Sequence, residues 1–304
     1  LIRHRLLASN PFTVLTALQI LDGNVPSMNT VSGSYGYLYE FLITGAFGRT
    51  SREVTDIDVK YNFLSECANF MYNRALTQMS EQQINEVLSQ FRKEYLVTVH
   101  EESLMRELVE SRVLGFQDGS YFFRYHYIYH YFVARQMRRI LSDPKKSEEA
   151  QQKLDFMVNN IHRDDCANIV ILLCYLSPDP AIIERILNKA KSVFSTHKPC
   201  QLQDEVAFLD KYVAKEPEVS VIESNPEQIR QLGRKAKDTF ESKRPTRPEP
   251  AVEVSDEQRD AALFEIRVAF KTMQVMGQIL KNFPGSLKGD LKLSLANECY
   301  QLGL

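Results

Sequence analysis

The chain has 304 residues, of which 44% are hydrophobic and 25% charged, and its formal net charge is −2. This composition predicts a globular protein of more than one subdomain, and the near-neutral charge gives no general attraction to nucleic acid or to an anionic membrane. No apolar run approaches the roughly 20 residues that cross a bilayer. The five cysteines are widely spaced without a Cys-x-x-Cys pair, which predicts reduced, buried thiols in a cytoplasmic protein.

The sequence pattern of the N-terminal region, residues 1–52, predicts a small helical domain. Asn10 and Pro11 form a helix start, because Asn caps a helix and Pro loses no hydrogen bond at the first helical position. Apolar residues then recur at helical spacing to about Leu21, and a second helix is predicted over 35–48. Since the chain begins without Met, in a stretch with the pattern of a helix interior, we expect it to be part of a longer protein.

The sequence of residues 57–142 has a pattern that predicts a winged-helix domain. Its pattern is three helices followed by a β-hairpin, in which Gly119 of a Gln-Asp-Gly-Ser turn can adopt a positive φ. Ser80 with Gln83 three residues later is a capping-box pattern and marks the start of the second helix. Another helix opens directly after the hairpin. The three helices are predicted at residues 59–77, 80–95 and 101–111, and the hairpin with the start of the next helix at 112–134.

The rest of the chain is also predicted to be helical. We predict a helical domain at residues 147–240 and a C-terminal helical segment at residues 256–304. Residues 241–255, with three prolines among charged residues, are predicted to form an extended linker between them. We therefore expect a mainly α fold with a small N-terminal helical domain, a winged helix with one hairpin wing, and a helical arm. The first helices of this arm are predicted at residues 149–160, 164–176 and 180–194.

Motifs that carry chemistry are missing from the sequence. It has no Gly-x-x-x-x-Gly-Lys-[Ser/Thr], no Gly-x-Gly-x-x-Gly, no Gly-x-Ser-x-Gly and no His-Glu-x-x-His. His126 and His130 share a helical face, but no acid or Cys lies near them in sequence, which favours ordinary packing or surface positions over a metal site. Asp164 and Asp165 beside His162 are typical of a helix N-terminus. We expect no catalytic residue and no metal site here.

A winged helix raises the possibility of DNA binding through its third helix. That helix carries four acids against two bases, and the wing carries one acid and no base, so phosphates would be repelled. Nucleic acid is therefore a disfavoured partner. A winged-helix DNA-binding transcription regulator with a helical sensing domain remains the alternative function, and a helical adaptor scaffold is a third. The acids are Glu101, Glu102, Glu107 and Glu110, and the bases are Arg106 and Arg112.

Three segments resemble STAND signalling NTPases, including the NACHT type. Residues 123–134, Phe-Arg-Tyr-His-Tyr-Ile-Tyr-His-Tyr-Phe-Val-Ala, resemble the family's Phe-x-His-x-x-Phe-Gln-Glu-Phe-Phe-Ala-Ala after the wing. Residues 10–15 resemble the Asn-Pro-Leu-x-Leu stretch that opens the helical lid after the ATPase core. Residues 269–287 are similar to the region downstream of the winged helix in STAND proteins of prokaryotic defence. The resemblance implies that residues 1–52 are the lid and that the chain lies C-terminal to an ATPase core.

The resemblance also implies cofactor-binding residues. The lid proline that contacts the adenine corresponds to Pro11. The family's winged-helix His, which contacts the β-phosphate of ADP, corresponds to Tyr125, with His126 one residue later, and the family's Glu corresponds to His130. ADP or ATP with Mg²⁺ would be shared with the ATPase core, because the P-loop is not in this sequence. This segment would bind no nucleotide alone.

The implied function is regulatory: coupling the ADP or ATP state of that core to activation and homo-oligomerisation, in antiviral defence. Its partners would be its own ATPase core and downstream sensor domains. The acidic third helix and an exposed aromatic run are candidates for the surface that faces the core, and ordinary core packing is the alternative for both. The run consists of Tyr125, Tyr127, Tyr129 and Tyr131.

Overall fold

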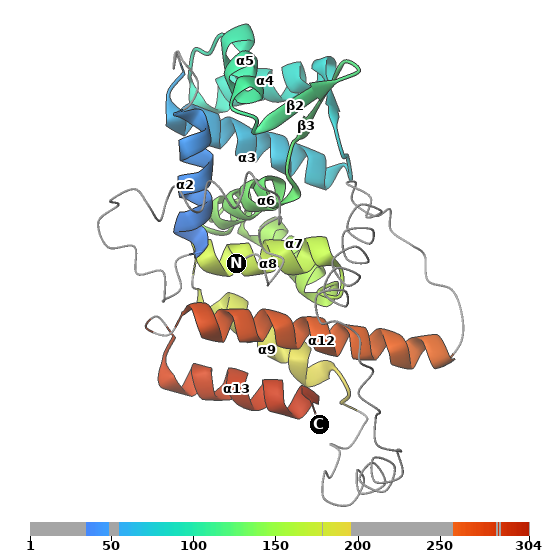
Figure 1. Ribbon diagram of the computed structural model, residues 1–304. Coiled ribbons are helices and arrows are strands. Elements are labelled where there is room, and N and C mark those ends of the chain that lie inside the picture. Colours follow the sequence, from blue (N-terminus) through green and yellow to red (C-terminus); the bar gives the residue numbers. More distant parts are fainter. Residues whose placement is uncertain are drawn as a thin grey trace, which may run out of the picture. The chain divides into compact units, whose positions relative to one another are not determined.

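The structure, a computed structural model, is mainly helical over the residues that it describes, with one small antiparallel sheet among them (Figure 1). None of its described helices combines the length and apolar character that a bilayer crossing requires. Pro11, the linker at 241–255 and most of the expected lid lie outside the described residues. The structure describes residues 35–48, 55–177, 179–195, 258–283, 285 and 287–303.

Helix α3 (Ile57–Asn73) ends four residues before the predicted boundary, at a left-handed turn. Ala75 has a φ of 51°, and the N–H of Leu76 reaches back to the carbonyl of Met71 over 2.9 Å. This is a Schellman motif, which satisfies the last carbonyls of a helix. Helix α2 (Tyr35–Phe47) precedes α3 near its predicted position.

Helix α4 (Glu81–Tyr95) begins with the predicted capping box. The N–H of Gln83 donates to Ser80 Oγ over 3.3 Å, and the N–H of Ser80 donates to Gln83 Oε1 over 2.9 Å. Helix α5 (Glu101–Glu110) follows it. These are the second and third helices that the sequence predicts.

The sheet contains the predicted hairpin of β2 (Leu114–Gln117) and β3 (Ser120–Phe123), with Gly115 opposite Phe122. Asp118 and Gly119 join the strands with φ values of 52° and 73°, so the turn uses the positive φ expected for the Gly. The order is β1-β3-β2. Strand β1 (Met79–Ser80) was not predicted, because two residues show no alternation.

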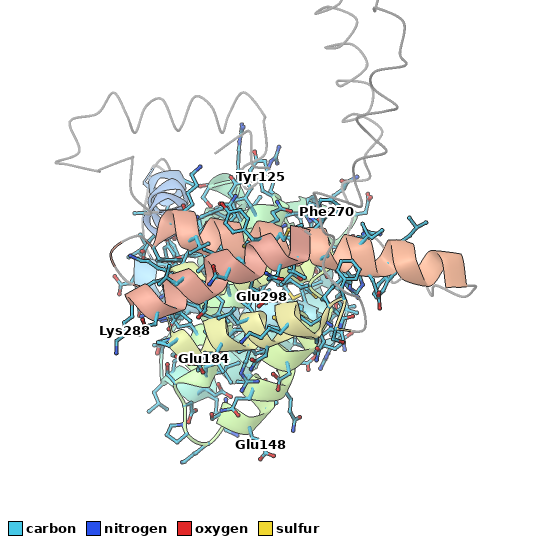
Figure 2. The ribbon with its side chains drawn as sticks, turned by 90° about the horizontal axis from the view of Figure 1, so that it is seen from below. Tyr125, Glu148, Glu184, Phe270, Lys288 and Glu298 are labelled. Atoms are coloured by element: carbon cyan, nitrogen blue, oxygen red, sulfur yellow. The ribbon has the colours of Figure 1, made fainter. Side chains whose placement is uncertain are left out.

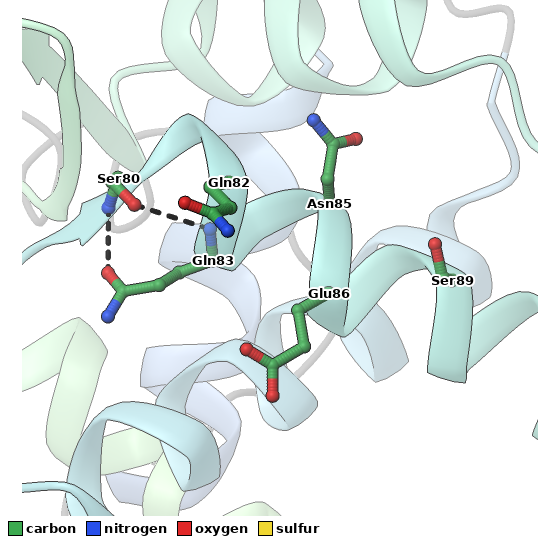
Figure 3. A pocket seen from close by; sticks show the side chains of 6 residues that line it. All are labelled: Ser80, Gln82, Gln83, Asn85, Glu86 and Ser89. Atoms are coloured by element: carbon green, nitrogen blue, oxygen red, sulfur yellow. Dashed lines mark hydrogen bonds between the residues drawn. The ribbon is translucent and has the colours of Figure 1, made fainter.

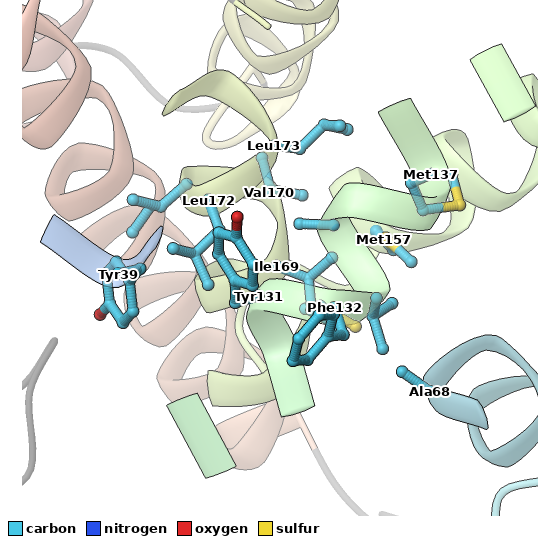
Figure 4. Close-up of a cluster of buried hydrophobic side chains, with 14 of the residues drawn as sticks. Tyr39, Ala68, Tyr131, Phe132, Met137, Met157, Ile169, Val170, Leu172 and Leu173 are labelled. Carbon is cyan, nitrogen blue, oxygen red and sulfur yellow. The ribbon is translucent and has the colours of Figure 1, made fainter. Parts of the chain in front are cut away.

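Helix α6 (His126–Leu141) lies in the middle of the packed helices, between α3 and α8 (Figure 1). Its buried Tyr131 and Phe132 lie among apolar side chains of α8, including Ile169 and Val170 (Figure 4). Helix α8 has a continuous apolar run, which explains why α8 is buried on several sides. The neighbouring helices are α7 (Ser147–Asn159), α8 (Asp164–Leu176) and α9 (Pro180–Ser192), within two residues of their predicted limits.

The C-terminal segment forms α12 (Gln258–Asn282) and α13 (Gly289–Gly303), seen from below in Figure 2. Helix α12 meets α8, where Asn282 Nδ2 donates to Tyr175 Oη over 2.5 Å, and helix α13 packs against α9. The predicted burial of the cysteines is confirmed for Cys67, Cys166 and Cys174, whereas Cys299 is half-buried. Cys200 lies outside the described residues.

Candidate functional site

Tyr125 occupies the N-cap position of α6, where β3 runs into the helix. Its backbone is extended, with φ −130° and ψ 132°, and its side chain does not cap the helix. Its carbonyl accepts hydrogen bonds from the N–H groups of Ile128 and Tyr129, over 3.1 and 3.2 Å. The half-exposed ring stacks on that of Tyr127, with centroids 5.5 Å apart and planes at 19°. Tyr125 is therefore half-exposed at the start of α6.

His126 is the first residue of α6 and its side chain is exposed. A helix N-terminus carries a partial positive charge and N–H groups that attract anions. The Tyr125 ring lies against Tyr127, and the His126 ring lies nearer to His130, so the two side chains have different neighbours at this helix end. The two site residues that the sequence named here are the N-cap and the first residue of α6, and their contact with a nucleotide stays a prediction.

His130, one turn further along α6, belongs to the interior. Its ring centroid lies 6.4 Å from that of His126, but the side chain is buried. Burial, assisted by the charge of His126, lowers the pKa of His130 to about 4, and the carboxylates of Asp165 and Asp164 only partly oppose this. His130 is therefore neutral at pH 7. No group of three or more His, Cys, Asp or Glu side chains that could hold a metal occurs among the described residues.

The expected exposed run of four tyrosines is wrong at Tyr131. Its side chain is fully buried, where it stacks at 17° on Tyr39 with centroids 6.2 Å apart and meets Tyr61 edge-on (Figure 4). Burial raises the pKa of Tyr131 to about 12. Core packing, the alternative from the sequence, holds for this residue, because it faces α2 and α8 together. Tyr125 and Tyr127 stay half-exposed.

One of the four acids expected on the surface of α5 is buried in the core. Glu107 is buried beside Lys60 of α3, with Oε2 3.0 Å from Nζ. The sequence did not predict that Lys60 and Glu107 form a pair. The periodicity of one helix does not show which other helix packs against its charged side chains. The surface of α5 is consequently less acidic than its sequence indicates. The acids that remain at the surface are Glu101, Glu102 and Glu110, against the exposed Arg106 and Arg112.

Asp164 and Asp165 lie in the first turn of α8, as predicted for a helix N-terminus. Burial disfavours the charged form of Asp165, but its pKa is lowered because the Arg163 guanidinium binds it over 2.8 Å and the Cys166 N–H donates to it over 2.9 Å. Burial raises the pKa of the Cys166 thiol to about 12. These groups stabilise the start of α8 and include no reactive thiolate.

A polar hollow of about 750 Å³ lies along α4 (Figure 3). Its single carboxylate, Glu86, is already paired with Arg74 over 2.7 Å. Amides and hydroxyls form the other walls, which offer neither an aromatic platform nor a cationic side chain for a nucleotide. The lining residues are Ser80, Gln82, Gln83, Asn85, Glu86 and Ser89.

Residues 77–133 match the model of the family described as Novel STAND NTPase 4. This region is similar to a STAND NTPase family. The matched stretch runs from just before β1 into α6, so it contains α4, α5, the hairpin and the start of α6. No curated protein matches the chain significantly.

The match confirms the resemblance to STAND NTPases that the sequence showed at residues 123–134. It includes Tyr125, His126 and His130, and it leaves Pro11 and residues 134–304 outside. The NACHT type, the role in defence and the position after an ATPase core stay predictions.

Proposed function

We propose that this chain is a regulatory segment of a STAND NTPase and that residues 57–142 are its winged-helix domain. One observation supports the proposal most. The residues that match the STAND family, 77–133, coincide with one structural unit that runs from β1 to the first turns of α6. The order of elements, α3-β1-α4-α5-β2-β3, agrees with a winged helix, and the β2–β3 hairpin would be its wing.

The N-terminus of α6 would contact the nucleotide held by an ATPase core. A phosphate fits this position, because helix N–H groups, the Tyr125 phenol and the His126 imidazole can all donate to it. Pro11 would contact the adenine. Mg²⁺ and the hydrolysis of ATP belong to the core in this proposal, since the sequence has no P-loop.

ADP would hold the winged helix against the core, and ATP would favour the released state. A ligand shifts such an equilibrium only by its different affinity for the two states, so the β-phosphate contact must differ between them. Release would permit homo-oligomerisation. Downstream sensor domains would trigger the exchange, in a cytoplasmic protein of antiviral defence.

The test uses the full-length parent protein with Tyr125→Ala, His126→Ala and both together. Nucleotide released by denaturing the purified protein is measured by chromatography, and oligomeric state by light scattering. We expect less retained ADP and assembly without a trigger. Tyr300→Ala in α13 and His100→Ala before α5 serve as controls, because both side chains are exposed and belong to other elements than α6. Unchanged ADP content together with an unchanged oligomeric state in the double variant would refute the assignment.

The DNA-binding alternative gains one observation, the burial of Glu107, which removes an acid from the surface of α5. Three acids still face two bases there, so phosphates are not favoured. A salt-dependent mobility shift of duplex DNA by this chain would reverse the ranking of the two functions.

A further inference from the structure

The pair formed by Lys60 and Glu107 is enclosed on all sides. Their side chains are 0% and 2% exposed, and Nζ lies 3.0 Å from Oε2. Two charges removed from water are stabilised only if good hydrogen bonds replace the water. The Lys60 ammonium lacks such a replacement, because no acceptor among the described residues lies in hydrogen-bond geometry around Nζ. The ammonium of this closed pair is therefore incompletely hydrogen-bonded.

Glu107 also contacts Thr55, which lies just before α3. The N–H and the hydroxyl of Thr55 approach its two carboxylate oxygens to 3.4 and 3.3 Å. On the other side, the Lys60 ammonium lies 5.3 Å from the ring centroid of Phe47, the last residue of α2. One buried pair thus contacts the end of α2, the entry of α3 and the middle of α5.

Helix α2 is also attached to Tyr61 of α3 in this region. Thr44 Oγ1 and Tyr61 Oη lie 2.9 Å apart, and Tyr61 Oη donates to the Glu40 carbonyl over 3.0 Å. The Phe47 ring meets that of Tyr61 at 75°, with centroids 5.8 Å apart. Because the Phe47 ring lies over the Lys60 ammonium, movement of the end of α2 would open the pair to water.

We propose that Lys60 and Glu107 form a conformational latch from which the end of α2 and the entry of α3 can separate reversibly. Apolar side chains of similar volume would hold these segments at least as tightly, because they carry no desolvation cost. They would gain nothing on opening. The charged pair regains its hydration when α2 moves away, which makes the open arrangement accessible. This inference concerns the chain's own conformation and does not depend on the proposed function.

The latch makes two predictions of opposite sign for amide hydrogen exchange in residues 39–48 and 55–61 of this chain. Lys60→Met with Glu107→Leu should slow exchange there at least threefold and leave Tm unchanged or higher. Glu107→Gln alone should speed it at least tenfold, because opening hydrates the uncompensated ammonium. A merely structural pair would instead change exchange in all helices together.

The matched control is the exposed pair of Arg74 and Glu86, replaced by Met and Leu, which should leave both segments at wild-type rates. If Glu107→Gln does not fold, Thr55→Val replaces it, since it removes one contact to Glu107 and keeps the pair; it should speed exchange at 55–61. The proposal is overturned if the double variant exchanges at the wild-type rate or faster in these segments, or fails to fold.

Discussion

The ring of Phe122 on β3 covers the α carbon of Gly115, its partner on β2. A Cβ atom built on Gly115 would lie 2.5 Å from Cζ of that ring and 2.6 Å from Cε2. Both are closer than carbon atoms can approach without a shift. The hairpin therefore needs a Gly at this position because of the ring opposite, and not because of its backbone conformation.

Gly115→Ala should destabilise the protein by about 1–3 kcal/mol, the range found when a packed site is overfilled. Urea denaturation measures the change. Adding Phe122→Leu should recover part of the loss, because the smaller side chain makes room for the methyl group. The control is Gly277→Ala in α12, where nothing lies within 4 Å of the added atom, and a gain of about 0.5–1 kcal/mol is expected. Equal stability of Gly115→Ala and wild type would contradict the contact.

Ser80→Ala should cost about 1 kcal/mol, because it removes the side-chain acceptor for the Gln83 N–H at the start of α4. Thermal unfolding followed by circular dichroism checks this. Ser89→Ala, exposed in the middle of the same helix, should be neutral or slightly stabilising. If both substitutions had the same effect, the capping box would contribute nothing to stability.

Glu66 of α3 joins three helices through one oxygen atom. Oε1 accepts hydrogen bonds from Tyr95 Oη and Gln136 Nε2, each over 3.1 Å, and forms an ion pair with Arg139. Gln136 is 3% exposed, and its Oε1 already lacks a partner. The carboxylate of Glu66 therefore satisfies a buried amide that has no alternative.

Glu66→Ala should cost about 2–3 kcal/mol, since it leaves the Gln136 amide without its acceptor in the interior. Chemical denaturation measures the loss. Glu86→Ala, which removes an exposed ion pair with Arg74, should cost less than about 1 kcal/mol. A smaller effect of Glu66→Ala than of Glu86→Ala would show that the network is dispensable.

His130 should make stability fall as the pH falls from neutrality. Burial lowers its folded-state pKa to about 4, whereas in the unfolded chain it has the ordinary value near 6.5, so between these values the unfolded chain binds more protons. The contribution is fully present above about pH 6.5. It is lost progressively toward pH 4, by up to about 3 kcal/mol.

His130→Met removes this titration and fills a similar volume. The free energy of unfolding of wild type minus that of the variant should therefore decrease between pH 7 and pH 4.5, with carboxylate titration common to both proteins. Denaturation curves at several pH values measure this difference. A difference that is constant with pH would show that His130 is not held neutral in the core.

Local elements of this fold could be read from the sequence because their causes are local. The capping box of Ser80 and Gln83 involves residues three apart, and the Asp118–Gly119 turn depends on the φ that a Gly allows. The α6 N-terminus, with Tyr125 and His126, followed from the hairpin before it. Strand β1 did not, because Met79 and Ser80 form a strand only where Tyr121 and Ser120 meet them.

The environments of several charged and aromatic side chains were decided only by the tertiary structure. Lys60 and Glu107 look like solvent-facing charges in their own helices, yet the packing of α3 against α5 encloses both. Tyr131 belongs to a tyrosine run in the sequence, and its burial results from α2 and α8 covering the same face of α6. A helical period shows which residues share a face. What lies opposite that face depends on residues distant in the chain, so only the folded structure determines which charges and rings are removed from water.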